Sequence, residues 1–407
     1  MLTTMLDRLG TLLSRQFIVS YFVPVLVFAF LNALLLAWQV SAFRVWAPAQ
    51  FEGLKGFYAL PVLIGFAVVA YFISSVSVYL RQVLEGRRLL PDVLLKEWVQ
   101  QQHALRESMS SRLKNARDRS YELQRQKPHW RARLVNAGDQ GLAAPRGADS
   151  YDESNAAARE IAELEKRRTK VEAVSKEDIE TAVTALESVL EVMDRGAGTA
   201  DARRLYEDYL KLLEILDYAE EVANIERSAA MNDVERSFSV DELRATRMGN
   251  VAAALDSYGE TRYRMNLAVY WSRMQLIIQD KKEIYGALVD AKCQLDFLVV
   301  CCWLCILTSA GWLVGMQWLP FSWLLYLLVL IVVPIGARFF YLLAVENYAV
   351  MADLIKSTVD LFRFQLLRNL HVPQPGGIRQ ERALWAALGD LTSGKEGLEI
   401  SYQHDGP

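Results

Sequence analysis

The sequence has few of the residues from which catalytic and metal centres are built. Its four histidines are scattered along 407 residues, and no acidic or thiol cluster lies beside any of them. The dinucleotide-binding glycine pattern, the Walker loop, the nucleophile elbow and the HExxH zinc motif are all absent. We therefore expect no enzymatic activity, no cofactor and no metal site.

The cysteines are equally restricted, because all four lie in one short stretch of the chain. They are Cys293, Cys301, Cys302 and Cys305. A disulfide framework needs cysteines that are spread over exposed loops. Thiolates are costly in lipid and no histidine is near, so we interpret these cysteines as small packing residues.

Charge is missing from one long stretch near the C-terminus. Phe297–Ala337 runs for 41 residues without Asp, Glu, Lys, Arg or His. One crossing of the hydrocarbon core needs about 20 apolar residues. The stretch therefore predicts two membrane spans, at 297–318 and 323–344, with a break near Pro320. Together they form a transmembrane hairpin within residues 296–346.

Two further uncharged runs, at 17–38 and 57–80, predict a second hairpin that turns near Gly53. A short amphipathic leader, residues 1–16, precedes it. The first run is too long for the apolar core of a signal peptide, which has about 7–15 residues. The sequence thus predicts an all-α membrane protein with four transmembrane helices, arranged as two hairpins that flank a helical domain.

Positive charge beside the spans predicts their orientation. The two hairpin turns together hold only Arg44 and Lys55, whereas the other ends of the spans are strongly basic. Both termini and the middle domain should therefore be cytoplasmic. The basic residues that support this are Arg8, Arg15, Arg81, Arg87, Arg88, Lys96, Lys281, Lys282, Lys292, Arg338, Lys356 and Arg363.

The middle of the chain, residues 81–295, is predicted to form a cytoplasmic helical-bundle or coiled-coil domain. Its apolar residues recur at alternating steps of four and three, as in helices that pack on one another. A capping box at Ser239-x-x-Glu242 predicts a helix start. No strong stop follows, so a helix from Ser239 could continue into the third span, either unbroken or kinked at Gly249, Gly259 or Gly286. Two apolar seams are Leu205, Tyr209, Leu212, Leu216, Ala219 and Ala223, and Tyr263, Leu267, Tyr270, Met274 and Ile277.

The C-terminal segment, residues 347–407, is predicted to hold an amphipathic helix at 348–370, a short helix at 378–388 and a polar tail. Its stretch Asp353-Leu-Ile-Lys-Ser-Thr-Val-Asp-Leu-Phe-Arg-Phe-Gln-Leu-Leu-Arg-Asn-Leu, with Glu381-Arg-Ala-Leu-Trp385 downstream, resembles the C-terminal end of uncharacterised multi-pass bacterial membrane proteins. That resemblance implies a location in the bacterial inner membrane. The overall plan is similar to bestrophin-type channels and to membrane effectors of bacterial defence systems, an analogy of architecture only.

The densest charge lies in residues 112–133, which carry eight Lys or Arg and two acidic residues, a net charge of +6 over 22 residues. Basic residues interleaved with aromatics suit an anionic nucleotide or oligonucleotide. Two alternatives stay open: pairing with an acidic helix around Glu207–Glu221, and contact with anionic lipid headgroups. The candidate ligand-binding residues are Arg112, Lys114, Arg117, Arg119, Tyr121, Arg125, Lys127, Trp130, Arg131 and Arg133.

Few polar side chains lie within the predicted spans. Such groups usually hydrogen-bond neighbouring helices, and less often line a pore. Arg338 either reaches the headgroups or pairs with Glu346, or it forms a ring at the inner mouth of a pore. The candidate pore-lining residues are Asn32, Ser74, Ser77 and Arg338. The prolines expected to kink or hinge a span are Pro24, Pro61 and Pro334.

These observations predict a homo-oligomeric, gated membrane pore whose cytoplasmic helical domain senses a ligand or a partner. A toxic effector of a bacterial defence system, regulated by a nucleotide or oligonucleotide, is one form that such a pore would take. The alternative is a membrane-anchored coiled-coil scaffold that recruits a soluble protein partner. A pore needs a hydrated path through the oligomer, whereas a scaffold needs none.

The charge distribution makes a topology prediction. Reporters fused after Ser150 and at the C-terminus should both read cytoplasmic, and a reporter at Gly53 should read external. The measurement is the activity of a pair of reporter enzymes, each active on one side of the membrane only. An external reading after Ser150 would contradict the orientation.

Overall fold

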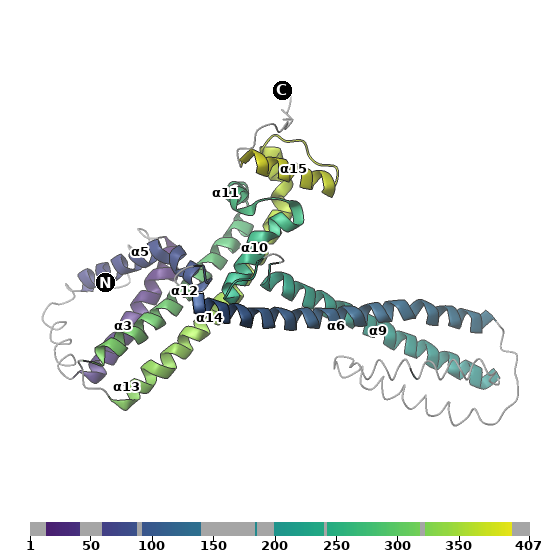
Figure 1. Cartoon of the computed structure of the whole chain (residues 1–407), viewed down its shortest axis with the longest axis horizontal. Coiled ribbons are helices and arrows are strands. Elements are labelled where there is room, and N and C mark those ends of the chain that lie inside the picture. The colour runs from purple at the N-terminus through teal and green to yellow at the C-terminus, as the bar shows by residue number, and fades with distance from the viewer. Residues whose placement is uncertain are drawn as a thin grey trace. The chain divides into compact units, whose positions relative to one another are not determined.

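The computed structural model describes residues 14–40, 59–87, 92–139, 184, 199–239, 242–317 and 322–392 (Figure 1). Among these residues all regular elements are helices. The predicted leader before Ser14, the turn around Gly53 and the polar tail lie outside the described residues. The elements are α2 (Arg15–Phe17), the π-helical η1 (Ile18–Phe22), α3 (Val23–Gln39), α5 (Ala59–Leu84), α6 (Asp92–Asp139), α9 (Thr199–Ser237), α10 (Arg247–Tyr263), α11 (Leu267–Ile278), α12 (Lys282–Gly315), α13 (Trp323–Leu327), the π-helical η2 (Leu328–Val332), α14 (Val333–Asn369) and α15 (Ile378–Thr392).

Four helical stretches are long and apolar enough to cross a membrane. Each overlaps one of the four spans predicted from the sequence. The prediction of an all-helical chain with four helices that could span a membrane is therefore confirmed. The stretches are Arg15–Gln39, Pro61–Leu84, Lys282–Gly315 and Trp323–Asn369.

The chain divides into two compact units, which we describe separately. Unit 1 comprises residues 1–104 and 235–407, and unit 2 comprises residues 105–234. All four candidate span helices belong to unit 1. The same unit includes the parts of the predicted middle domain that lie next to the spans in sequence.

In unit 1, α12 and α14 pack against each other and extend well beyond the predicted spans. They have 34 and 37 residues, or roughly 51 and 56 Å at 1.5 Å per residue, against a hydrocarbon core about 30 Å thick. The amphipathic helix predicted at 348–370 is thus the continuation of the fourth span. We call the ends of α12 and α14 outside the predicted spans, together with α10, α11 and α15, the helical layer; they share one buried core.

A continuous helix from Ser239 into the third span does not form. The predicted start of this helix is also wrong. α10 starts at Arg247, where the side chain of Thr246 accepts the backbone N–H of Gly249 at 3.0 Å. Ser239 instead donates its hydroxyl to that of Ser257 at 2.9 Å. Ser239-x-x-Glu242 therefore has the sequence pattern of a capping box, but α10 does not start there.

That expected helix is also interrupted after α10. Arg264 adopts φ 64°, in the left-handed region that ends helices, and Asn266 caps α11 by accepting the N–H of Val269. The predicted seam nevertheless packs in the core, because Tyr263 ends α10 and the other members lie on one face of α11. Its buried members are Tyr263, Leu267, Tyr270, Met274 and Ile277.

Two of the three prolines lie next to a π-helical segment. Pro24 follows η1 and Pro334 follows η2, each in the first turn of the next α-helix. Proline lacks an N–H and clashes with the carbonyl four residues earlier, and a widened π turn accommodates both effects. Pro61 lies in the first turn of α5, where the N–H has no helical partner to lose.

Unit 2 contains an antiparallel pair formed by residues 105–139 of α6 and 199–234 of α9, which we call the α6/α9 arm. The register follows from Arg119 pairing with Glu226 while Lys127 pairs with Asp217. Ser120 is fully buried and donates to the side chain of Asn224 at 2.7 Å. One buried polar pair among alanines and leucines specifies such a register. The buried apolar residues are Ala116, Leu123, Leu213, Leu216, Ala219 and Ala223.

α15 is held on the helical layer by Trp385. Its side chain is 0% exposed, and its ring meets that of Tyr270 edge-on at 5.2 Å between centroids. Glu381, also buried, pairs with Arg363 of α14 at 2.7 Å. The short helix predicted at 378–388 is therefore four residues longer and belongs to the folded core of unit 1.

Replacing Trp385 with Ala should cost about 3–5 kcal/mol, because it empties a buried aromatic site. Hydrogen exchange of residues 378–392 should then approach that of an unfolded peptide. Leu391→Ala is the matched control on the same helix, since Leu391 is 46% exposed, and it should leave exchange unchanged. Full protection of α15 in the Trp385 variant would contradict this anchoring role.

Candidate functional site

α5 ends in a turn that presses its backbone against the first turn of α10. Gly86 adopts φ 73°, which glycine tolerates without strain. A Cβ at Gly249 would lie only 2.1 Å from the carbonyl oxygen of Glu85, so no residue larger than glycine fits there without a shift. The end of a candidate span helix and the start of a layer helix are thus in direct backbone contact.

The side chain of Glu85 is a buried carboxylate, 3% exposed, at this contact. Arg87 lies 2.8 Å from it and Arg81 3.4 Å. The phenol of Tyr348, from α14, donates to it at 3.2 Å. Burial raises the pKa of Glu85, whereas the two arginines and the phenol favour the charged form. The charge on Glu85 therefore depends on its partners staying in place.

The same cluster continues onto α10. Arg87 also pairs with Asp256 at 2.7 Å, and Asp256 pairs with Arg244 at 3.2 Å. Arg244 in turn holds Glu242 through two hydrogen bonds. Of these acids only Glu85 is buried; the side chains of Asp256 and Glu242 are 56% and 60% exposed, so each outer pair contributes only about 0–1 kcal/mol. We define the Glu85 junction as Arg81, Glu85, Arg87, Asp256 and Tyr348.

The junction joins three helices that meet where the second candidate span ends. α5 contributes Arg81, α10 contributes Asp256 and α14 contributes Tyr348. Because α14 runs unbroken from the fourth candidate span into the layer, the layer cannot shift against α5 without separating these charges. The site therefore offers mechanical coupling between the layer and the spans.

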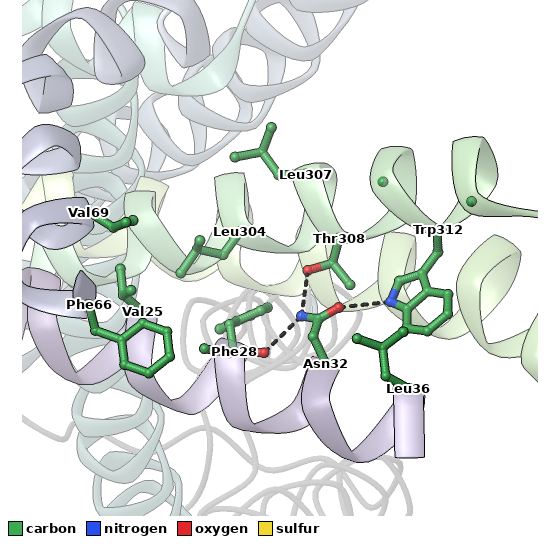
Figure 2. A pocket seen from close by; sticks show the side chains of 13 residues that line it. Val25, Phe28, Asn32, Leu36, Phe66, Val69, Leu304, Leu307, Thr308 and Trp312 are labelled. Carbon is green, nitrogen blue, oxygen red and sulfur yellow. Dashed lines mark hydrogen bonds between the residues drawn. The ribbon is translucent and has the colours of Figure 1, made fainter. Parts of the chain in front are cut away.

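Asn32, a predicted pore residue, bonds within its own chain. Its side-chain amide donates to the hydroxyl of Thr308 at 3.3 Å and accepts the indole N–H of Trp312 at 2.7 Å (Figure 2). A third bond runs to the carbonyl of Phe28. This polar group lies beside an open, mostly apolar groove of about 480 Å³ between α3, α5 and α12. Its role is to tie α3 to α12.

Ser74 and Ser77 also face inward, beside a residue that the sequence analysis missed. The hydroxyl of Ser77 donates to the carbonyl of Ser74 at 2.8 Å, and both hydroxyls lie beside the phenol of Tyr21. That phenol donates to the carboxylate of Asp296 at 2.9 Å. Asp296 is the last charged residue before the third uncharged run. A carboxylate at the edge of an apolar run was the feature of the sequence that could have identified it.

Arg338 is the predicted pore residue that faces away from its own chain. Its side chain is exposed, and its guanidinium carbon lies 5.5 Å from the ring centroid of Tyr341. Between the described residues Arg338 and Glu346 no ion pair forms, so of the alternatives left open for Arg338 the pairing with Glu346 is not formed, and the side chain makes a cation–π contact instead.

The basic segment of α6 divides into paired and exposed side chains. Arg119 pairs with Glu226 at 3.2 Å, and Lys127 lies 2.5 Å from both Asp217 and Glu220. Those two hydrogen bonds raise the pKa of Lys127. Pairing with an acidic helix therefore accounts for two of the predicted ligand residues.

The other candidate ligand residues of α6 carry no such ion pair where their side chains are described. Their side chains are exposed: Arg112, Lys114, Arg117, Tyr121 and Arg125. Arg227, from α9, also approaches the ring of Tyr121 and was not predicted. The side chains of Trp130, Arg131 and Arg133 lie outside the described ones.

All four cysteines lie on α12. Cys301, Cys302 and Cys305 are buried, and the sulfur of Cys305 lies 3.7 Å from where a Cβ of Gly336 would be. Their burial against α14 agrees with a packing role. Within the described part of the chain, no group of three or more His, Cys, Asp or Glu could hold a metal ion.

Comparison of the chain with protein-family models, with curated proteins and with solved structures finds no match. Its function is therefore argued from its own contacts.

The backbone contact at Gly249 makes the junction testable. Gly249→Ala should destabilise unit 1 by about 1–3 kcal/mol, the usual cost of overpacking. Gly286→Ala in α12 is the matched control, since nothing lies within 4 Å of its Cβ position; it should be neutral or stabilising by up to about 1 kcal/mol. Thermal unfolding in detergent measures both, and equal stability of the two variants would exclude a tight α5–α10 contact.

Proposed function

We propose that this protein is a homo-oligomeric, gated pore of the bacterial inner membrane, with the helical layer and unit 2 in the cytoplasm. The observation that carries the proposal is the Glu85 junction. Buried ion pairs add little to stability, and their best-attested use is to specify one arrangement over another. A junction of this kind at the exit of a span supports transmission of a signal from the layer to the membrane.

The ends of the candidate spans are grouped as this proposal requires. Ser20 donates to the carbonyl of Cys293, and Trp303 donates to the carbonyl of Leu80. These contacts join η1, near the start of the first candidate span, and the end of α5 to α12, at positions on either side of the start of the third predicted span at 297. Trp312 packs with Leu36 and Leu325 at the other end. The grouping fits two hairpins whose turns share one side of the membrane.

The pore of this proposal lies between copies of the chain. Within one chain, Asn32, Ser74 and Ser77 already have partners, so they do not line an internal path. Arg338 faces outward, and one such residue per subunit would form a positive ring near the inner mouth. A ring of this charge favours anions and repels cations. The Tyr341 ring beneath each guanidinium offsets part of the cost of holding a charge at this depth.

The in-chain bonding of the span polar groups also favours a second candidate, a membrane-anchored scaffold. In that function the spans only anchor the chain, and the α6/α9 arm recruits a soluble partner. Ile225 and Met231 of α9 are 62% and 49% exposed and offer apolar contact area on the arm. This candidate requires no ion flux.

Ion flux from purified protein in liposomes separates the two functions. The pore proposal expects flux, and it expects Arg338→Glu to shift the reversal potential toward cations. Arg338→Lys keeps the charge and is the matched control, so its reversal potential should match that of the natural chain. Absence of flux from folded, oligomeric protein would leave the scaffold. Unchanged selectivity in a well-assembled Glu variant would remove Arg338 from the pore wall.

A further inference from the structure

One flank of α6 in unit 2 carries a row of basic side chains around an aromatic ring. Lys114, Arg117, Tyr121 and Arg125 are three, four and four residues apart, so they lie on one face of the helix. All four side chains are exposed. At 1.5 Å per residue the row is about 17 Å long. We call these four residues the α6 basic row.

α9 adds a fourth cation to this row. The guanidinium carbon of Arg227 lies 5.9 Å from the ring centroid of Tyr121, and that of Arg117 lies 5.3 Å from it. Arg227 is positioned by a hydrogen bond of 3.4 Å to the hydroxyl of the buried Ser120. Tyr121 still remains 50% exposed between the two guanidinium groups. The ring is therefore accessible and has positive charge beside it.

The acidic side chains of α9 pair with basic residues of α6 that lie outside the α6 basic row. Glu226 pairs with Arg119, and Asp217 and Glu220 pair with Lys127. Within the described residues no ion pair forms to Lys114, Arg117 or Arg125. Asp118 and Glu122 are exposed acids beside the row, so its cations and Arg227 together exceed these acids by two charges over about three helical turns.

We propose that the α6 basic row, with Arg227, binds a single-stranded nucleic acid, whose phosphates contact the four cations and one of whose bases stacks on Tyr121. Phosphates repeat along such a strand as the cations repeat along the helix, and an aromatic face accepts any base. Neither an acidic peptide nor a lipid headgroup would use the ring in this way. This inference rests on the proposed function, because it names the class of ligand that the cytoplasmic part senses.

The test is fluorescence anisotropy of a labelled uridine oligonucleotide of about 10 nucleotides, with the full chain in detergent. We expect binding at 50 mM salt that weakens about 50-fold by 200 mM, because four phosphate contacts in a single strand give a log–log slope of about −3. No binding at 50 mM salt would overturn the proposal.

Two charge reversals on the same helix form a matched pair. Arg117→Glu should weaken binding at least about tenfold and make the salt dependence shallower. Arg112 was a candidate ligand residue from the sequence, but it lies nine residues before Tyr121, on the opposite side of the helix, so this proposal excludes it from the site; Arg112→Glu makes the same charge change there. It should change affinity by less than about twofold. Equal losses in both variants would show a diffuse charge effect and overturn the assignment to the row.

The ring is tested separately. Tyr121→Ala should weaken oligonucleotide binding by roughly 5- to 150-fold, the range for loss of one stacked base. Tyr121→Phe keeps the ring and should bind the oligonucleotide as tightly as the natural chain. The affinity for inorganic polyphosphate, which has no base to stack, should be the same in both variants. An unchanged affinity in the Ala variant, or tighter binding to anionic lipid vesicles than to the oligonucleotide, would overturn the nucleic-acid assignment.

The binding readout does not depend on ion flux. Flux without oligonucleotide binding would therefore remove this ligand and leave the pore, whereas binding without flux would remove the pore and keep the ligand.

Discussion

Glu85 places a negative charge where three helices of unit 1 meet, and the contacts around it depend on how that charge is neutralised. Arg81 comes from its own helix, Arg87 follows it in the turn, and Tyr348 reaches it from α14. The turn itself is possible because Gly86 takes a positive φ and Gly249 has no side chain. Electrostatics and backbone sterics thus specify one arrangement of α5, α10 and α14 together.

The helical layer extends this arrangement away from the spans. Tyr258 and Tyr263 at the end of α10 both donate to the carboxylate of Asp360 in α14, at 2.9 and 2.7 Å. Burial, followed by the nearby carboxylate, raises the pKa of both phenols, so they stay protonated and keep donating. Hydrogen-bonded charge therefore joins α10 to α14 through Asp360, whereas Glu85 joins the turn after α5 to α14.

The sequence predicted the helices and the apolar faces well, because both follow from local periodicity. The seam of α11 and three buried residues of α9, Leu216, Ala219 and Ala223, were recognisable from spacing alone, whereas the buried Leu213 was not predicted. Breaks that depend on tertiary contacts were not recognisable: Arg264 is an ordinary residue until its left-handed backbone is seen. The junction was also hidden, since Glu85 reads as one more charge at the edge of a span until Tyr348, 263 residues later, is placed beside it.

The unbroken length of α14 has a geometric consequence. The helix continues for 25 residues past the predicted end of the fourth span at 344, or roughly 38 Å. A transmembrane helix adjusts its tilt to the thickness of the bilayer around it. Over an extension of this length, a change in the tilt of α14 of about five degrees moves its C-terminal end by roughly 3 Å. A small adjustment inside the lipid thus moves Arg363, 19 residues past the predicted end of the span, by roughly 2.5 Å, close to the 2.7 Å length of its ion pair with Glu381.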